Sequence, residues 1–215
     1  MIDQVEDWTH AGRRVIHRGH IATFEEEDIV SPAGESMTRE MLIHPGSVAI
    51  VALNDVGRIA VVHQYRAPFG MRLVEPPAGL LDVPGEAPLA AAKRELAEEA
   101  GLAADDWRVL ADYCPSPGIT DEVARIFLAR HLSVVPRPDG FAAHGEESDM
   151  GLSWLRIDDA LAGVRAGQLH NGAMVIGVIA LCLARLDGTV DDLPPGDAPW
   201  PLRERVLSLK TGRHG

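Results

Sequence analysis

The stretch GLLDVPGEAPLAAAKRELAEEAGL, residues 79–102, combines a predicted helix with an unusual concentration of acidic side chains. Pro88 suits the first turn of a helix and Gly101 suits a C-terminal cap, so the segment between them is predicted to form a helix of about three turns. Apolar residues recur along it at helical spacing, which predicts one buried face. That face consists of Leu89, Ala92, Leu96 and Ala100.

Three glutamates, Glu95, Glu98 and Glu99, lie beside the predicted buried face. Like charges at these spacings repel, and the dipole of the helix disfavours anions in its last turn by about 0.3 to 1 kcal/mol each. Arg94 offsets part of this repulsion by pairing with Glu98 at the i, i+4 spacing. The alternatives are a solvated acidic face and a site for a hard divalent cation, which prefers oxygen ligands. The abutting apolar stripe and the Gly/Pro-rich turn before the helix favour the cation.

The same residues resemble the Nudix box, the signature of hydrolases that cleave nucleoside diphosphates linked to another moiety. The matching positions are Gly79, Glu86, Arg94, Glu95, Leu96, Glu98, Glu99, Gly101 and Leu102. One departure is that six residues, where the family has five, separate Gly79 from Glu86. The resemblance implies that Glu95, Glu98, Glu99 and the backbone carbonyl of Ala78 hold Mg²⁺, with Mn²⁺ as a possible substitute. Arg94 and Glu98 are carried over as catalytic candidates.

Two segments before the box resemble those of ADP-ribose pyrophosphatases. They are His63–Pro68, with the sequence HQYRAP, and Glu75–Gly79, with the sequence EPPAG. Arg66 offers a planar fork of donors suited to a diphosphate, and the alternative for it is a surface ion pair. By this resemblance Arg66 and Glu75 are candidate substrate-binding residues.

Two segments after the box extend the same resemblance. In the loop SPGITDE, residues 116–122, Pro117 stands close to the marker proline of the subfamily, and Gly118 and Glu122 are candidate substrate-binding residues. A later polar loop holds Glu146 and Glu147, where the subfamily carries a glutamate that binds metal or activates the attacking water. Both remain candidates and Glu147 is favoured. The alternative is that the two glutamates are solvated loop charges without a catalytic role.

The implied activity is Mg²⁺-dependent hydrolysis of ADP-ribose to AMP and ribose 5-phosphate. One alternative is a Nudix pyrophosphatase for another nucleotide sugar or dinucleotide. Another is a noncatalytic ADP-ribose-binding regulator, for which a decayed glutamate motif or an added basic domain is expected, and neither is seen.

Composition limits the partners of the chain. Its 215 residues carry a formal net charge of -12, which argues against nonspecific binding to nucleic acid or to an anionic membrane surface. Only Cys114 and Cys182 are present, far apart and without metal-ligand spacing, as expected for reduced thiols in the cytoplasm. The first residues lack the apolar core of a secretory signal. The longest apolar run, Ala173–Ala184, is too short to span a bilayer and is predicted to be a buried helix.

The order of predicted elements indicates an α/β (α+β) protein, a Nudix-type α/β/α sandwich around a mixed sheet. Strands are predicted at residues 13–20, 20–30, 36–44, 48–53, 58–65, 107–113, 123–129 and 152–157. Besides the box helix, helices are predicted from Asp158 or Asp159 to near Gly167 and at about 172–186. Residues 1–45 are predicted to form an accessory antiparallel sheet, residues 46–188 the catalytic domain, and residues 189–215 a Pro-rich tail that wraps the surface or is partly disordered. The resemblance implies a homodimer joined through the accessory sheet.

Overall fold

A computed structural model describes residues 2–137 and 151–212, which divide into two compact units. The N-terminal unit comprises Met1–Gly46 and Cys114–Glu122, and the larger unit comprises Ser47–Tyr113 and Val123–Gly215. Residues 114–122 therefore group with the N-terminal unit, although they lie far from it in the sequence. The three-part division expected from the sequence remains a prediction.

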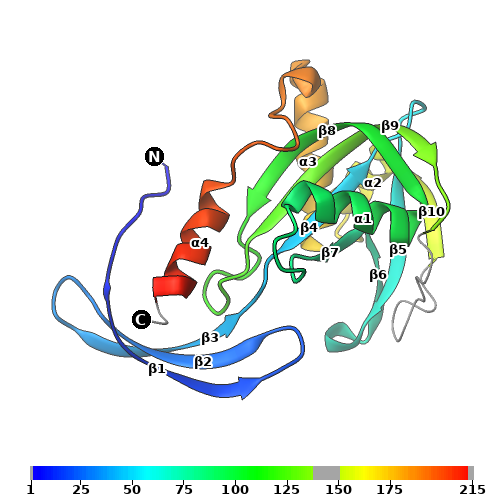
Figure 1. Cartoon of the computed structure of the whole chain (residues 1–215). Helices are drawn as coiled ribbons and strands as arrows, with labels where there is room; N and C mark the ends of the chain where they lie inside the picture. The colour runs from blue at the N-terminus through cyan, green and yellow to red at the C-terminus, as the bar shows by residue number, and fades with distance from the viewer. Residues whose placement is uncertain (1, 138–150, 213–215) are drawn as a thin grey trace. The chain divides into compact units, whose positions relative to one another are not determined.

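The N-terminal unit is built on an antiparallel sheet of strands β1 (Thr9–Arg18), β2 (Thr23–Val30) and β3 (Ser36–Ile43), in the order β1-β2-β3 (Figure 1). Glu25 and Glu27 of β2 are buried on one face, because residues two apart point to the same side of a strand. They pair with Arg13 and His10 of β1. Loop 114–122 adds a parallel bridge between Leu42 and Thr120.

The larger unit contains a four-stranded mixed sheet in the order β7-β4-β9-β8. Its strands are β4 (Ser47–Ala52), β7 (Ala78–Leu80), β8 (Leu102–Tyr113) and β9 (Ala124–Val134). Strand β4 runs parallel to β9 and antiparallel to β7, and β8 runs antiparallel to β9. A second, antiparallel sheet has the order β10-β5-β6, with β5 at Arg58–Arg66, β6 at Met71–Glu75 and β10 at Gly151–Arg156. A short 3-10 helix, η1 (Ala67–Phe69), joins β5 to β6.

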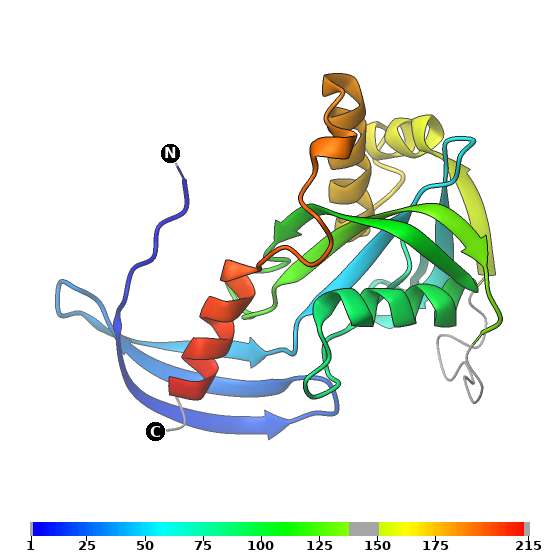
Figure 2. The same ribbon diagram turned by 45° about the horizontal axis from the view of Figure 1, so that its top comes forward.

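Alternation along β4 creates two apolar cores, one on each face of the mixed sheet. Val48, Ile50 and Ala52 point toward helix α1 (Pro88–Ala100), whereas Ala49 and Val51 point toward helices α2 (Ile157–Arg165) and α3 (Gly172–Asp187). Figures 1 and 2 show these helices on opposite sides of the sheet. The α/β/α sandwich predicted from the sequence, with a small antiparallel sheet before it, is confirmed.

Helix α3 packs closely on the sheet because a glycine faces β4. A Cβ built on Gly177 would lie 2.8 Å from Val51 Cγ2, so a larger residue there would push the helix away. The helix begins at the N-cap Asn171, whose side chain accepts a hydrogen bond from the backbone N–H of Met174. The apolar run read as a buried helix thus belongs to α3, and no described helix is long and apolar enough to cross a membrane.

Two strands and several boundaries differ from the sequence prediction. Strands β6 and β7 were not predicted, because they are short and the two prolines between them obscure any alternation. Strand β8 begins directly after the box helix at Leu102 rather than at Trp107, and β9 continues to Val134. Strand β1 begins earlier than expected, at Thr9, and ends at Arg18.

The described part of residues 189–215 contains helices that the sequence did not predict. This segment forms a 3-10 helix, η3 (Val190–Asp192), and helix α4 (Pro201–Gly212). Between them Trp200 is 4% exposed and joins the core beneath α1. Helix α4 was missed because its apolar residues show little helical periodicity.

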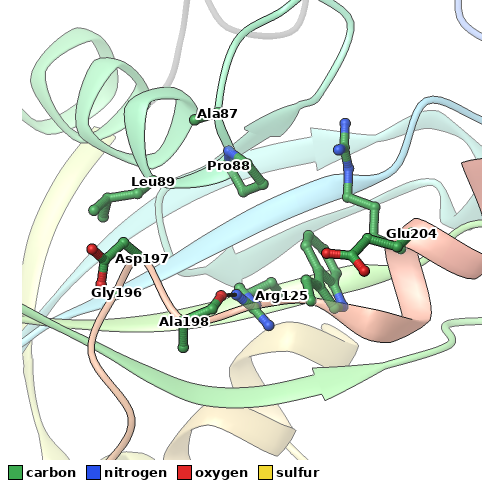
Figure 3. A pocket seen from close by; sticks show the side chains of 10 residues that line it. Ala87, Pro88, Leu89, Arg125, Gly196, Asp197, Ala198 and Glu204 are labelled. Carbon is green, nitrogen blue, oxygen red and sulfur yellow. Dashed lines mark hydrogen bonds between the residues drawn. The ribbon is translucent and has the colours of Figure 1, made fainter.

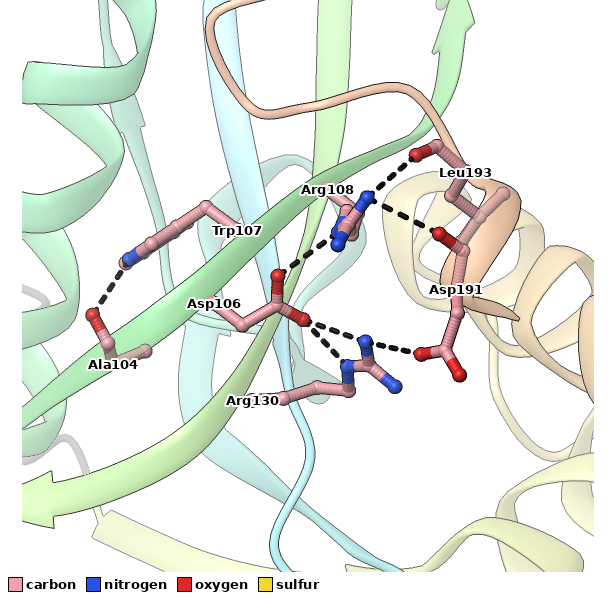
Figure 4. Close-up of polar contacts among 7 residues, drawn as sticks. All are labelled: Ala104, Asp106, Trp107, Arg108, Arg130, Asp191 and Leu193. Carbon is pink, nitrogen blue, oxygen red and sulfur yellow. Dashed lines mark hydrogen bonds and ion pairs between the residues drawn. The ribbon is translucent and has the colours of Figure 1, made fainter. Parts of the chain in front are cut away.

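Two arginine-centred networks hold this C-terminal segment against the mixed sheet. In the first, Asp106 accepts hydrogen bonds from Arg108 and Arg130, and Arg130 also pairs with Asp191 of η3 (Figure 4). Burial would raise the pKa of Asp106, but the hydrogen bonds from Arg130 and Arg108 outweigh it and lower the pKa below its ordinary value.

The second network centres on Arg125 of β9, whose side chain is 3% exposed. Its Nε and Nη2 donate to the two carboxylate oxygens of Asp112 at 2.7 and 2.9 Å. The same guanidinium donates to the backbone carbonyls of Ala198 and Pro199 and lies 4.6 Å from the centre of the Trp200 ring. Arg125 therefore ties β8, β9 and the C-terminal segment together.

Arg125→Ala is expected to lower the free energy of unfolding by about 2–4 kcal/mol, because it removes the hydrogen bonds that the buried guanidinium donates to Asp112 and to two backbone carbonyls. Urea unfolding followed by circular dichroism measures this change. The control is Arg156→Ala, since Arg156 is 62% exposed and pairs with Asp158 and Asp159 only at 3.7 and 3.8 Å. Equal stability of the two variants would contradict the prediction.

Candidate functional site

The box helix α1 has the ends that the sequence predicts. Pro88 occupies its first turn, and Gly101 caps its C-terminus in the left-handed conformation at φ 63°. The backbone N–H of Gly101 donates to the carbonyls of Ala97 and Leu96. Because Gly101 ends the helix abruptly, β8 begins at the next residue and α1 is anchored at that end.

The buried face of α1 holds Ala91, Ala92, Leu96 and Ala100, with Leu89 partly buried against the same core. Most of these side chains are small, so the helix lies close to the sheet. The glutamates at 95, 98 and 99 border this face and are only partly buried. Burial of apolar surface therefore holds the acidic side chains at the edge of the sheet.

Arg94 connects three of the acidic side chains around α1. Its Nε and Nη2 donate to the two carboxylate oxygens of Glu86 at 3.0 and 3.1 Å. Its Nη1 donates to Glu95 at 2.6 Å and to Glu98 at 3.0 Å, so the expected i, i+4 pair is present. The hydrogen bonds to Glu86 and the negative charge of Glu95 raise the pKa of Arg94 above its ordinary value, although burial opposes this.

The role of Glu86 was missed at the sequence level. Glu86 precedes the helix and is eight residues from Arg94, too far for a helical pairing rule. The turn 81–87 brings it back to the helix, despite the additional residue between Gly79 and Glu86. The match of Glu86 to the box was the only sequence signal available.

Strand β7 places its backbone against two glutamates of α1. The backbone N–H of Ala78 donates to Glu99 Oε2 at 3.0 Å. At Gly79, an added Cβ would lie 2.1 Å from both Cδ and Oε1 of Glu95, far inside van der Waals contact. Gly79 is therefore required for the close approach of Glu95 to the strand, which is a physical reason for glycine at the start of the box.

The donor chemistry of this cluster fits a hard divalent cation. Three carboxylates, those of Glu86, Glu95 and Glu98, pair with the single guanidinium of Arg94, and the Glu99 carboxylate binds the backbone N–H of Ala78. An excess of negative charge therefore remains when the four glutamates are ionised. Carboxylate and carbonyl oxygens are the ligands that Mg²⁺ and Mn²⁺ accept. Within residues 2–137 and 151–212, however, no three His, Cys, Asp or Glu side chains converge as they would around a metal ion.

Arg66 and Glu75 are brought together by the antiparallel pairing of β5 and β6. Arg66 Nε donates to Glu75 Oε1 at 2.9 Å, and Arg66 Nη2 donates to Glu75 Oε2 at 2.6 Å. Arg66 and Glu75, which were both expected to contact the substrate, therefore form an ion pair with each other. The ion pair that was the alternative for Arg66 is present, although its partner is buried.

The other substrate-binding candidates, Gly118 and Glu122, belong to the N-terminal unit. Gly118 is exposed, and an added Cβ there would meet no atom within 4 Å. Glu122 Oε1 lies 3.8 Å from His44 Nδ1, and the backbone N–H of Glu122 donates to Thr120 Oγ1. Glu146 and Glu147 lie outside the described residues.

A pocket of about 210 Å³ lies at the N-terminal end of α1 (Figure 3). None of its lining residues is one of the carboxylates gathered around Arg94, so it is separate from the candidate metal site. The lining residues are Ala87, Pro88, Leu89, Arg125, Gly196, Asp197, Ala198, Trp200, Arg203 and Glu204.

Comparisons of sequence and structure relate this chain to known proteins. A model of the NUDIX domain matches residues 43–172. An ADP-ribose pyrophosphatase of Mycobacterium tuberculosis (strain ATCC 25618 / H37Rv) is 43% identical over 175 residues, covering 81% of this chain and 83% of the relative. A methanol dehydrogenase activator of Bacillus methanolicus is 33% identical over 163 residues, covering 76% and 86%. A solved structure titled as an ADP compounds hydrolase shares the fold with a TM-score of 0.72 at 20% identity, covering 88% of this chain and all of that one.

Gly79→Ala is expected to weaken Mn²⁺ binding by about tenfold or more, because the new Cβ would displace the Glu95 carboxylate. Stability should change by less than about 1 kcal/mol, since the end of a flexible side chain can move aside. Titration with Mn²⁺ followed by electron paramagnetic resonance, together with urea unfolding, measures both effects.

The matched control is Gly151→Ala, where an added Cβ would meet no atom within 4 Å. That variant should bind Mn²⁺ as the wild type does. An unchanged Mn²⁺ affinity in Gly79→Ala would contradict the prediction, because cation binding would then not depend on the position of Glu95 against β7.

Proposed function

The chain belongs to the Nudix family, and from that premise we propose that it hydrolyses ADP-ribose to AMP and ribose 5-phosphate with the help of Mg²⁺. The observation that carries the proposal is the group of α1 glutamates held at the edge of the sheet against the backbone of β7. The substrate class is supported by the 43% identity to an ADP-ribose pyrophosphatase and by the sequence SPGITDE at residues 116–122.

Glu95, Glu98, Glu99 and the backbone carbonyl of Ala78 are the groups proposed to hold the cation. When bound, a divalent cation polarises the phosphorus–oxygen bonds and lowers the pKa of a bound water. Arg94 positions Glu95 and Glu98, because one nitrogen of its guanidinium donates to both. The Nε and Nη2 atoms of Arg94 donate to Glu86, and these two bonds hold the guanidinium in one orientation.

The remaining proposed roles concern the substrate and the proton. Arg66 donates to the diphosphate, and Gly118 and Glu122 contact the rest of the substrate, with Glu122 near the terminal ribose. Glu147, with Glu146 as the alternative, accepts a proton from the attacking water. The water oxygen forms a bond to one phosphorus, the bond from that phosphorus to the bridging oxygen breaks, and AMP and ribose 5-phosphate leave.

The same proposal extends to assembly and location. We propose a homodimer in which the sheet β1-β2-β3 takes part, since a three-stranded sheet needs a hydrophobic face or a packing partner to be stable. The cysteines Cys114 and Cys182 form no disulfide, which supports a cytoplasmic enzyme.

Incubation with Mg²⁺ and ADP-ribose is expected to release AMP and ribose 5-phosphate in equal amounts, measured by ion-exchange chromatography. Glu99→Gln should lower kcat by about 100-fold or more, because it removes one charge from the proposed cation site and keeps the shape of the side chain. Glu204→Gln is the matched control, since Glu204 lines the separate pocket, and its kcat should stay near that of the wild type.

A panel of nucleotide sugars and dinucleotides decides the substrate. If another nucleoside diphosphate compound is hydrolysed faster than ADP-ribose, that compound is the better substrate. The proposed cation-assisted hydrolysis of a diphosphate would still hold. Binding of ADP-ribose without release of AMP at any divalent ion concentration would reject the enzyme and favour a regulator.

Light scattering coupled to size-exclusion chromatography is expected to give twice the 23.2 kDa mass of the chain. Deletion of residues 1–45 should then reduce the mass to that of one shortened chain, because the proposed dimer depends on the sheet β1-β2-β3. A full-length chain that elutes as a monomer would reject the dimer.

A further inference from the structure

Arg66 and Glu75 form an ion pair in which one partner is hidden and the other is accessible. The Glu75 side chain is 2% exposed, whereas the Arg66 side chain is 37% exposed. Both carboxylate oxygens accept a hydrogen bond from Arg66. The pair therefore consists of a buried carboxylate that holds one edge of the guanidinium of a partly exposed arginine.

The backbone fixes the direction of the Arg66 side chain as well. Val62 is opposite Glu75 in the ladder between β5 and β6, and Arg66 lies four residues beyond Val62 on the same face of the sheet. Arg66 must therefore extend back along the sheet to reach Glu75. Its own carbonyl accepts a hydrogen bond from the N–H of Gly70 at 3.0 Å, which closes the turn that follows.

A direct contact between Glu75 and the substrate is physically unfavourable. The proposed substrate is a diphosphate and carries the same charge as the carboxylate, so the two repel each other. A buried carboxylate also depends on its hydrogen-bond donors, and removing Arg66 from it would leave an unpaired buried charge.

We propose that Glu75 is a positioning residue for substrate binding. It holds Arg66 through Nε and Nη2, so that the guanidinium is kept in one orientation from which it can donate to the diphosphate. This inference rests on the proposed function. Its physical basis is pre-organisation, because an arginine already fixed in its binding conformation loses less side-chain entropy when the substrate arrives.

A double-mutant cycle on Arg66 and Glu75 tests the inference. Glu75→Gln should raise KM for ADP-ribose by about tenfold, and Arg66→Ala should raise it further. The double variant Arg66→Ala/Glu75→Gln should bind no worse than Arg66→Ala alone, because Glu75 acts only through Arg66. In all three, kcat should change by less than about threefold, since the contact is made in the ground and transition states alike.

Two other roles for Glu75 predict different results. If Glu75 contacts the substrate itself, the two effects multiply, and the double variant is about tenfold worse than Arg66→Ala. If the pair only stabilises the fold, Glu75→Gln lowers the melting temperature and leaves KM unchanged. Either result would overturn the inference.

Asp112→Asn is the matched structural control, because Asp112 and Arg125 form a similar two-bonded pair across neighbouring strands. It should lower the melting temperature and leave KM unchanged. If Glu75→Gln does not fold, Arg66→Lys tests the same point, since lysine keeps the charge but cannot bind both oxygens as a planar fork. An unchanged KM in Arg66→Lys would then reject the inference.

A second readout separates this inference from the proposed function. The dissociation constant of α,β-methylene-ADP-ribose, measured by calorimetry, should follow the same non-additive pattern as KM. If the dissociation constants of the wild type and the three variants show that pattern, but the wild type does not hydrolyse ADP-ribose, the proposed activity is rejected and the positioning role is supported. A wild type that hydrolyses ADP-ribose while the effects on binding multiply would reject only the positioning role.

Discussion

The structure depends on holding three carboxylates around one arginine, with a fourth carboxylate nearby in the same helix. Such a cluster is unfavourable by itself, because like charges repel and the helix dipole disfavours anions near the C-terminus. Arg94 relieves part of the repulsion through Glu86, Glu95 and Glu98. The remaining negative charge is the physical basis for proposing a divalent cation at this place, because such an ion would offset the charge of both the carboxylates and an anionic substrate.

Apolar packing supplies the rigidity that this cluster requires. The small buried face of α1 keeps the helix close to the mixed sheet, and Gly79 lets Glu95 approach the backbone of β7. The C-terminal segment supports the same core through Trp200, whose ring lies against Arg125 of β9. Packing and charge are thus coupled, because the residues that bury α1 also fix where its glutamates lie.

Local rules predicted much of this arrangement. The ends of α1 and the pairing of Arg94 with Glu98 follow from residue spacing within one helix, and the structure confirms both. The contact between Glu86 and Arg94 could not be predicted in this way, since it depends on the path of the turn that precedes the helix. Strands β6 and β7 were missed because each has only a few residues and two prolines interrupt the pattern between them.

The sequence by itself determined the family resemblance, the sandwich of helices around a mixed sheet, and the chemistry of the α1 glutamates, because these depend on residue types at fixed local spacings. Only the tertiary structure decided which long-range partners the charged residues take. It paired Arg66 with Glu75, placed the backbone of Ala78 against Glu99, and turned part of the expected tail into a helix anchored by Trp200. The physical reason is that strand pairing and burial bring together residues that no local periodicity relates.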